Sequence, residues 1–260
     1  MADASLGTSH WIPGPRQVVR EALMLTRLPR GLAGVAWRCV RPDVPVHVVE
    51  EIGDHRDLPA PLADGTDRDQ PLEQGFGPAL HREFRVRVTG ARRRAADLVD
   101  AIARDMNRCV VPGVARFDYV AAGGAMTVGE ELVVRMPGPW DGPVRVLSRE
   151  PSAFRLGTLT GHLEAGQIEF SARDVGAAGD DLEFGITTWA RAGDRIADVL
   201  YTRLGLAKEI QYLLWVEFCV RAAALAGGRV AGGVTVRTRT VAWPDADPAA
   251  DAPEISRRAV

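Results

Sequence analysis

Two residues with acid–base chemistry, His162 and Glu164, lie two positions apart in the segment GTLTGHLEAGQIEF. On a β-strand such residues share a face, so the imidazole and the carboxylate could act as acid and base or polarise a bound carbonyl group. If the Thr-Gly-His segment is instead a turn, this argument fails. His162 would then hydrogen-bond to the backbone of a tight bend, and Glu164 would lie on the surface. The pair is our candidate for catalysis, with that structural alternative left open.

Six further residues have the types expected of a ligand-binding site. The loop PGPWDGP holds Trp and Asp between prolines and glycines, which is typical of a gate at a cavity mouth or of a rigid turn whose Trp caps the core. A Trp and an Arg end a predicted strand, where the Arg could bind a ligand carboxylate or pair with Asp194. A Gln and a Phe lie along the apolar side of a predicted helix. These candidates are Trp140, Asp141, Trp189, Arg191, Gln211 and Phe218.

Sharper catalytic or cofactor-binding motifs are missing from the sequence. It contains no GxSxG, Walker A, HExxH or EF-hand motif, and the HxE triplet at His162 lacks the PCxxC of a zinc deaminase. Cys39, Cys109 and Cys219 are widely spaced and form no CxxC pair, so they predict neither a disulfide framework nor a metal site. We therefore expect no cofactor and no metal.

The composition is that of a soluble globular protein. Of the 260 residues, 46% are hydrophobic and 25% are charged, and no apolar stretch is long enough to span a bilayer. The formal net charge of -2 gives no basic footprint, which argues against nucleic acid as a partner. The first residues do not resemble a secretory signal, so the expected location is the cytoplasm.

Alternation of apolar and polar residues predicts a sheet. Phe84, Val86 and Val88 alternate with polar residues as in a strand with one buried face, and apolar residues then recur at helical spacing from Ala95 to Met106. Gly and Pro turns separate the short strands that follow, which is typical of an antiparallel meander and not of βαβ units. These strands are expected at 115–121, 128–136, 143–149, 153–160, 166–174 and 181–189.

A long helix is predicted after the last of these strands. It runs from about Asp194, as N-cap, to a stop at Gly227 and Gly228, and its apolar side would cover one face of the sheet. A strand, a helix, an antiparallel sheet and a long C-terminal helix, in this order, predict an α+β helix-grip architecture. In such a fold the curved sheet wraps the helix, and an apolar pocket remains between them.

The segment GTLTGHLEAGQIEF also resembles the GTLPGHPE-x-GEE-x-F signature of a bacterial and plant family catalogued as a domain of unknown function and placed near the START and polyketide-cyclase (SRPBCC) superfamily. The resemblance covers roughly residues 81–226. The sequence departs from the signature at Thr160 and Leu163, where the family often has Pro, and TWARAG stands in place of an aromatic-Ser-Arg-Pro segment. The resemblance implies a START-like helix-grip fold and no agreed activity.

Charge and pattern divide the chain into four parts. Residues 1–42 are basic with helical apolar spacing, and residues 43–80 are an acidic, Pro-rich connector with one short strand expected at Val46–Val49. The helix-grip domain follows at 81–242, and a flexible tail at 243–260. The N-terminal helices could pack on the core domain or, through residues 15–40, make peripheral contact with an anionic membrane. A homo-oligomer is also an open alternative.

Two classes of function fit these observations. The first is a soluble protein that binds an apolar small molecule, lipid-like or polyketide-like, in an internal cavity. The second is a cofactor-independent cyclase, isomerase or dehydratase of secondary metabolism, in which the same cavity folds a reactive substrate while His162 and Glu164 move protons. Binding is favoured because the shape and lining of a pocket are sufficient for it.

Overall fold

A computed structural model describes residues 44–62, 65–112, 114–120, 126–135, 141–176, 180–193 and 206–243 of the chain. The predicted N-terminal helical extension at 1–42, with its membrane-contact segment at 15–40, lies outside the described residues. So does all of the predicted tail except Trp243.

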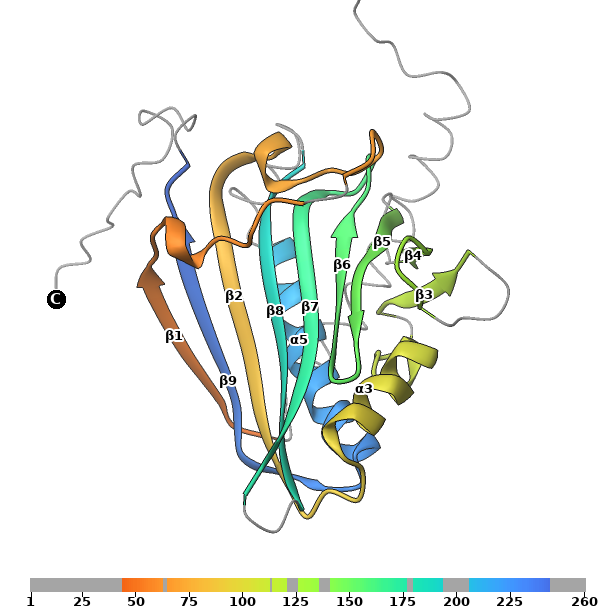
Figure 1. Ribbon diagram of the computed structural model, residues 1–260. Coiled ribbons are helices and arrows are strands. Elements are labelled where there is room, and N and C mark those ends of the chain that lie inside the picture. The colour runs from red at the N-terminus through yellow and green to blue at the C-terminus, as the bar shows by residue number, and fades with distance from the viewer. Residues whose placement is uncertain are drawn as a thin grey trace, which may run out of the picture.

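The described residues form one nine-stranded sheet and two helices of ten residues or more (Figure 1). The strand order is β1-β9-β2-β8-β7-β6-β5-β4-β3. Every neighbouring pair is antiparallel except β1 and β9. The strands are β1 (Val46–Ile52), β2 (Phe76–Thr89), β3 (Arg116–Tyr119), β4 (Glu131–Arg135), β5 (Asp141–Glu150), β6 (Ala153–Thr158), β7 (Glu164–Val175), β8 (Asp181–Ala192) and β9 (Arg229–Val241).

The predicted meander is present. Each of the six strands expected between 115 and 189 corresponds to one of β3 to β8, and the helix expected from Ala95 is α3 (Ala95–Arg104). The second helix, α5 (Leu206–Leu225), ends close to the predicted stop, where Gly227 adopts the left-handed φ of 76° that commonly ends helices. The first part of the predicted long helix, 194–205, lies outside the described residues. The described residues thus form an α+β protein with a large, mainly antiparallel sheet and two α-helices.

The segment predicted as a connector is part of the sheet and of its cover. Its strand β1 pairs in parallel with β9, from Val46 opposite Val234 to Ile52 opposite Thr240, a departure from the predicted antiparallel sheet. Parallel pairing is available here because β1 and β9 are far apart in the chain, so no tight hairpin fixes their direction. Two short 3-10 helices, η1 (His55–Asp57) and η2 (Leu72–Gln74), follow β1, and β2 begins at Phe76.

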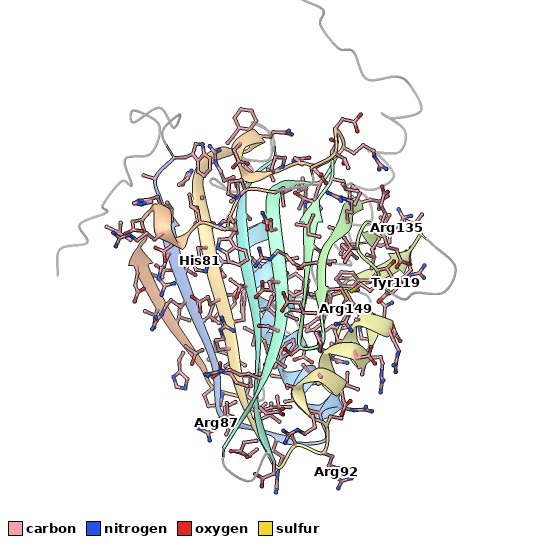
Figure 2. All side chains as sticks on the ribbon, viewed as in Figure 1. His81, Arg87, Arg92, Tyr119, Arg135 and Arg149 are labelled. Carbon is pink, nitrogen blue, oxygen red and sulfur yellow. The ribbon has the colours of Figure 1, made fainter. Side chains whose placement is uncertain are left out.

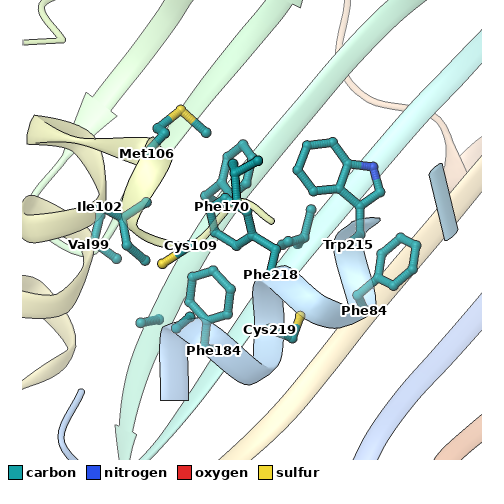
Figure 3. Close-up of a cluster of buried hydrophobic side chains, with 14 of the residues drawn as sticks. Phe84, Val99, Ile102, Met106, Cys109, Phe170, Phe184, Trp215, Phe218 and Cys219 are labelled. Carbon is teal, nitrogen blue, oxygen red and sulfur yellow. The ribbon is translucent and has the colours of Figure 1, made fainter. Parts of the chain in front are cut away.

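Both helices cover the same face of the sheet, which we call the inner face; the opposite, outer face is toward the viewer in Figure 1. Apolar side chains from the strands and from α5 form its core, with aromatic rings in contact (Figure 3). Phe170 lies at their centre, with ring centroids 4.8 Å from Phe154, 5.3 Å from Phe218 and 5.6 Å from Trp215. The ring layer therefore holds α5 onto β6 and β7.

Truncating the central ring of this layer is expected to destabilise the fold strongly. Phe170 is 0% exposed, so Phe170→Ala leaves a cavity and should lower the free energy of unfolding by about 3–5 kcal/mol in urea denaturation. The exposed Val120 at the end of β3 provides the control, since Val120→Ala should change stability by less than about 0.5 kcal/mol. Equal effects of the two substitutions would contradict this description of the core.

Candidate functional site

His162 and Glu164 lie where β6 turns into β7. β6 ends at Thr158 and β7 begins at Glu164, so His162 belongs to a turn and not to a strand. Gly161, with φ of 97°, provides a backbone conformation that residues with a Cβ rarely adopt. The Thr-Gly-His segment is therefore a turn, the alternative left open from the sequence. The argument that His162 and Glu164 share one face of a strand does not apply.

The His162 ring is fixed by the backbone of this turn. The Glu164 N–H donates to Nδ1 at 2.9 Å; the Glu164 carbonyl oxygen is also 3.1 Å from Nδ1, but because an amide N–H can only donate, Nδ1 must accept. The proton of the neutral ring is then on Nε2. This edge of the ring packs over Gly142, where a Cβ would lie 2.9 Å from Nε2. Burial lowers the pKa of His162 and so favours the neutral ring. The negative charge of Glu164 has the opposite, smaller effect.

A pocket of about 300 Å³ opens beside this turn. One wall is held by Gln70, whose Nε2 donates to the His162 carbonyl at 3.1 Å and whose Oε1 accepts from the Gly161 N–H at 3.2 Å. The neighbouring Asp69 is 3% exposed and accepts hydrogen bonds at 2.6 and 3.0 Å from Arg145 of β5, which anchors the segment. The pocket is lined by Gln70, Gln74, Thr160, Gly161, His162, Leu163 and Gly193.

The aromatic candidate Trp189 lies on the outer face. Its ring stacks on His81 of β2 with centroids 5.3 Å apart, and the Arg155 guanidinium lies 5.2 Å from the ring centroid. Its Nε1 donates to the Asp57 carbonyl of η1 at 2.8 Å. His81 is 8% exposed, and Figure 2 labels it on the upper half of β2. Trp189 therefore holds η1 onto the outer face.

Arg191, two residues after Trp189 on β8, also lies on the outer face and contacts the segment that covers it. It donates to the Leu72 carbonyl of η2 at 2.9 Å and to the Gly77 carbonyl at 2.8 Å, and its guanidinium lies 4.2 Å from the centroid of the Trp243 ring. At 4% exposure it is a buried cation in contact with the covering segment. The predicted partner Asp194 lies outside the described residues.

The remaining candidates are divided between two other places. Asp141 begins β5 and forms an ion pair with Arg135, next to Gly142 and so near His162. Phe218 is 0% exposed in the core between α5 and the inner face. Trp140 and the side chain of Gln211 lie outside what the structure describes. The described candidates thus occupy the β6–β7 turn, the outer face and the inner face, and do not line one cavity.

The inner face itself has two halves that differ in exposure. In the lower half of Figure 1 the inner side chains of β2 are sealed, with Phe84 0%, Val86 1% and Val88 0% exposed. In the upper half Leu80 and Arg82 are partly exposed, as are Ala190 of β8 and Ile168 of β7. The inner face is therefore accessible toward the end where β2 begins.

Two polar residues on the inner side were not predicted from the sequence. Trp215 of α5 is 7% exposed, and its Nε1 has no hydrogen-bond partner in the part of the chain that the structure describes. Arg82 lies two positions before Phe84 on β2, so continuing the alternation Phe84, Val86, Val88 one step toward the N-terminus would have placed it on the inner face. No comparable sequence signal marks Trp215, because its orphan N–H depends on tertiary packing.

The described residues offer neither a metal-binding cluster nor a membrane-spanning helix. None of their His, Cys, Asp and Glu side chains gather in a group of three that could hold a metal ion. In the same part of the chain no helix has both the length and the apolar character needed to cross a membrane.

Sheet, helices and chain order define an α+β protein in which one sheet face packs on two helices. The family model described as "Domain of unknown function (DUF1990)" matches residues 81–211, about half of the chain, and the chain belongs to this family. The family resemblance carried by GTLTGHLEAGQIEF is thereby confirmed. A comparison with curated proteins gave no match.

Solved structures with a similar arrangement have low sequence identity. A solution structure of a protein from Thermobifida fusca is 15% identical, with 56% of this chain and 94% of that one covered and a TM-score of 0.38. Ara h 8.0201 is 14% identical, with 52% and 99% covered and a TM-score of 0.30. The major latex-like protein 151 from Panax ginseng is 13% identical, with 52% and 98% covered and a TM-score of 0.31. At these scores the likeness is loose and extends to neither ligand nor activity.

The lowered pKa values of His162 and His81 predict a pH dependence of stability. Burial lowers the pKa of His162, and likewise that of His81, below about 6.5, the ordinary value that the unfolded chain retains. Between the folded and the unfolded pKa the unfolded state binds more protons, so the free energy of unfolding should fall as the pH drops below about 6.5. Urea denaturation at several pH values measures this fall.

A variant assigns part of this effect to the turn. His162→Gln should show a smaller loss of stability between neutral and mildly acidic pH than the unmodified protein. His47→Gln, at an exposed site on β1, provides the control and should leave the loss unchanged. An identical pH dependence in all three proteins would contradict the burial argument for His162.

Proposed function

We propose that this protein is a helix-grip protein that binds an apolar small molecule, lipid-like or polyketide-like, between the inner face of the sheet and α5. The observation that carries the proposal is the partial exposure of the inner face at its upper half. Leu80, Ile168 and Ala190 retain access to solvent there, whereas Phe84 and Phe184 further along the same face are 0% exposed. Apolar surface that is only partly covered is a feature of small-molecule sites.

The orphan donor on α5 supports the same location. A buried N–H without an acceptor costs free energy, on the order of 1–3 kcal/mol, unless a partner binds it. The Trp215 Nε1 is such a donor in the layer between helix and sheet. In Figure 3 this nitrogen lies on the side of the indole ring that is turned away from Phe170. A ligand with one acceptor atom and an otherwise apolar body would suit this environment.

The alternative is a cofactor-independent cyclase, isomerase or dehydratase, and the pocket beside His162 is the observation in its favour. A neutral imidazole with its proton on Nε2 can donate to a carbonyl oxygen and polarise it. The geometry is less suited to proton abstraction, because Nδ1 already accepts from the Glu164 N–H. We therefore rank binding above catalysis.

Filling the exposed half of the inner face should block binding. N-phenyl-1-naphthylamine, a neutral apolar probe whose fluorescence rises in apolar surroundings, should bind the unmodified protein. Ala190→Phe places a ring in the proposed site and should weaken this binding at least about tenfold, equivalent to about 1.4 kcal/mol. Fluorescence titration measures both affinities.

The same substitution on the outer face is the matched control. Ala153 begins β6 and faces outward, because its neighbour Phe154 is buried in the core. Ala153→Phe should bind the probe as the unmodified protein does. Absence of probe binding to the unmodified protein, or full binding by Ala190→Phe, would refute the proposed site.

A further inference from the structure

Arg82 places a positive charge at the edge of the apolar inner face. It follows Leu80 and precedes Phe84, Val86 and Val88 in the inward alternation of β2. Those last three side chains are at most 1% exposed, whereas Arg82 is partly exposed. The guanidinium therefore lies where the sealed core gives way to the accessible half of this face.

This guanidinium has no carboxylate partner among the described residues. Its Nε donates to the Thr238 hydroxyl of β9 at 3.2 Å, and it forms no ion pair with any described residue. In the register of the sheet the acid of the same row is Glu50, exposed on β1 and two strands away. By contrast, Arg239 on the outer face pairs with Glu83 at 2.8 Å. The Nη donors of Arg82 are thus unused by carboxylates of the described chain.

The cross-strand neighbours of Arg82 form one row across the inner face. Those on the two adjacent strands carry hydroxyl groups, and those further along the row are apolar. Arg82 is opposite Thr238 on β9 and Thr188 on β8. Thr188 is 9% exposed, and its hydroxyl forms no hydrogen bond with a described residue. The same row continues through Ile168 of β7, which is apolar and partly exposed, to Leu156 of β6, which is apolar and only 1% exposed. One row of the inner face therefore runs from a cation with hydroxyl neighbours to an apolar surface.

We propose that Arg82 binds the carboxylate of an amphipathic ligand whose apolar body lies across Ile168 and Leu80, the partly exposed apolar residues of this face. The planar guanidinium can hold both carboxylate oxygens through parallel N–H donors, and the Thr188 hydroxyl supplies a further donor on the adjacent strand. The attraction between Arg82 and the carboxylate is stronger here than on the exposed surface, because the ligand covers the ion pair in part and water screens it less. The inference rests on the proposed function and specifies its ligand as an organic acid with a large apolar part.

Displacement of N-phenyl-1-naphthylamine by two matched ligands tests this inference. Dodecanoate and dodecanol share a twelve-carbon chain and differ in the ionised head group, and each is used below the concentration at which it aggregates. At neutral pH, where the carboxyl group is ionised, dodecanoate should displace the probe roughly tenfold to a hundredfold more effectively, as expected for a charge-assisted hydrogen-bonded pair. Arg82→Gln should abolish most of this preference and leave dodecanol binding nearly unchanged.

Two variants control for position and for folding. Arg87 lies on the outer face of the same strand and pairs with Asp181 at 3.1 Å, so Arg87→Gln should keep the preference for dodecanoate. Arg82→Lys keeps the charge without the planar fork and should show an intermediate preference, which remains measurable even if Arg82→Gln does not fold.

The outcomes separate the inference from the function beneath it. If the probe does not bind the unmodified protein, the proposed function itself is wrong and the inference is wrong with it. If the probe binds but dodecanoate and dodecanol displace it equally, or Arg82→Gln keeps the full preference, only the carboxylate inference is overturned.

Discussion

The structure depends on a mismatch of area between the sheet and its helical cover. A nine-stranded sheet presents a wide inner face, and α3 and α5 pack on only part of it. Where they pack, aromatic rings such as Phe170 and Phe218 exclude water completely. Beyond this layer the inner face stays partly exposed, at the end where β2 begins. The two helices among the described residues do not seal a sheet of this width, and the accessible region that we assign to a ligand follows from that limit.

The two faces of the sheet differ in the hydrogen-bond partners of their polar side chains. On the outer face the segment after β1 covers buried polar side chains and supplies their partners: the Asp57 carbonyl accepts from Trp189 and the Leu72 carbonyl from Arg191. On the inner face the Trp215 N–H has no acceptor, and Arg82 has no carboxylate among the described residues. Buried polar groups are normally paired, so the Trp215 N–H is a candidate contact for a ligand. Missing partners alone do not separate the two faces, because the buried Nδ1 of His81 on the outer face also has no hydrogen-bond partner among the described residues.

The sequence predicted the parts of this fold that depend on local pattern. Alternation located the inward residues Phe84, Val86 and Val88, and helical spacing located α3 and the end of α5. It could not give the partner of β1, because pairing between Val46 and Val234 joins segments at opposite ends of the domain and leaves no local trace. The same strand rule, applied to Leu182, Phe184 and Ile186, places Trp189 on the outer face, which separates it from Phe218. Individual candidates could thus be recognised, but their grouping required the register of the sheet.

The β6–β7 turn shows why a residue of catalytic type need not have a catalytic environment. His162 accepts a hydrogen bond at Nδ1 from the next residue but one, and its Nε2 edge packs over the backbone of Gly142. To take up a proton at Nδ1 the ring would have to release the Glu164 N–H and loosen a turn that Gln70 also holds. Burial opposes the charged ring as well, which is the direction of its pKa shift. A fixed neutral imidazole can donate to a bound oxygen but is poorly placed to carry protons, and this asymmetry favours binding over acid–base catalysis at the pocket beside this turn.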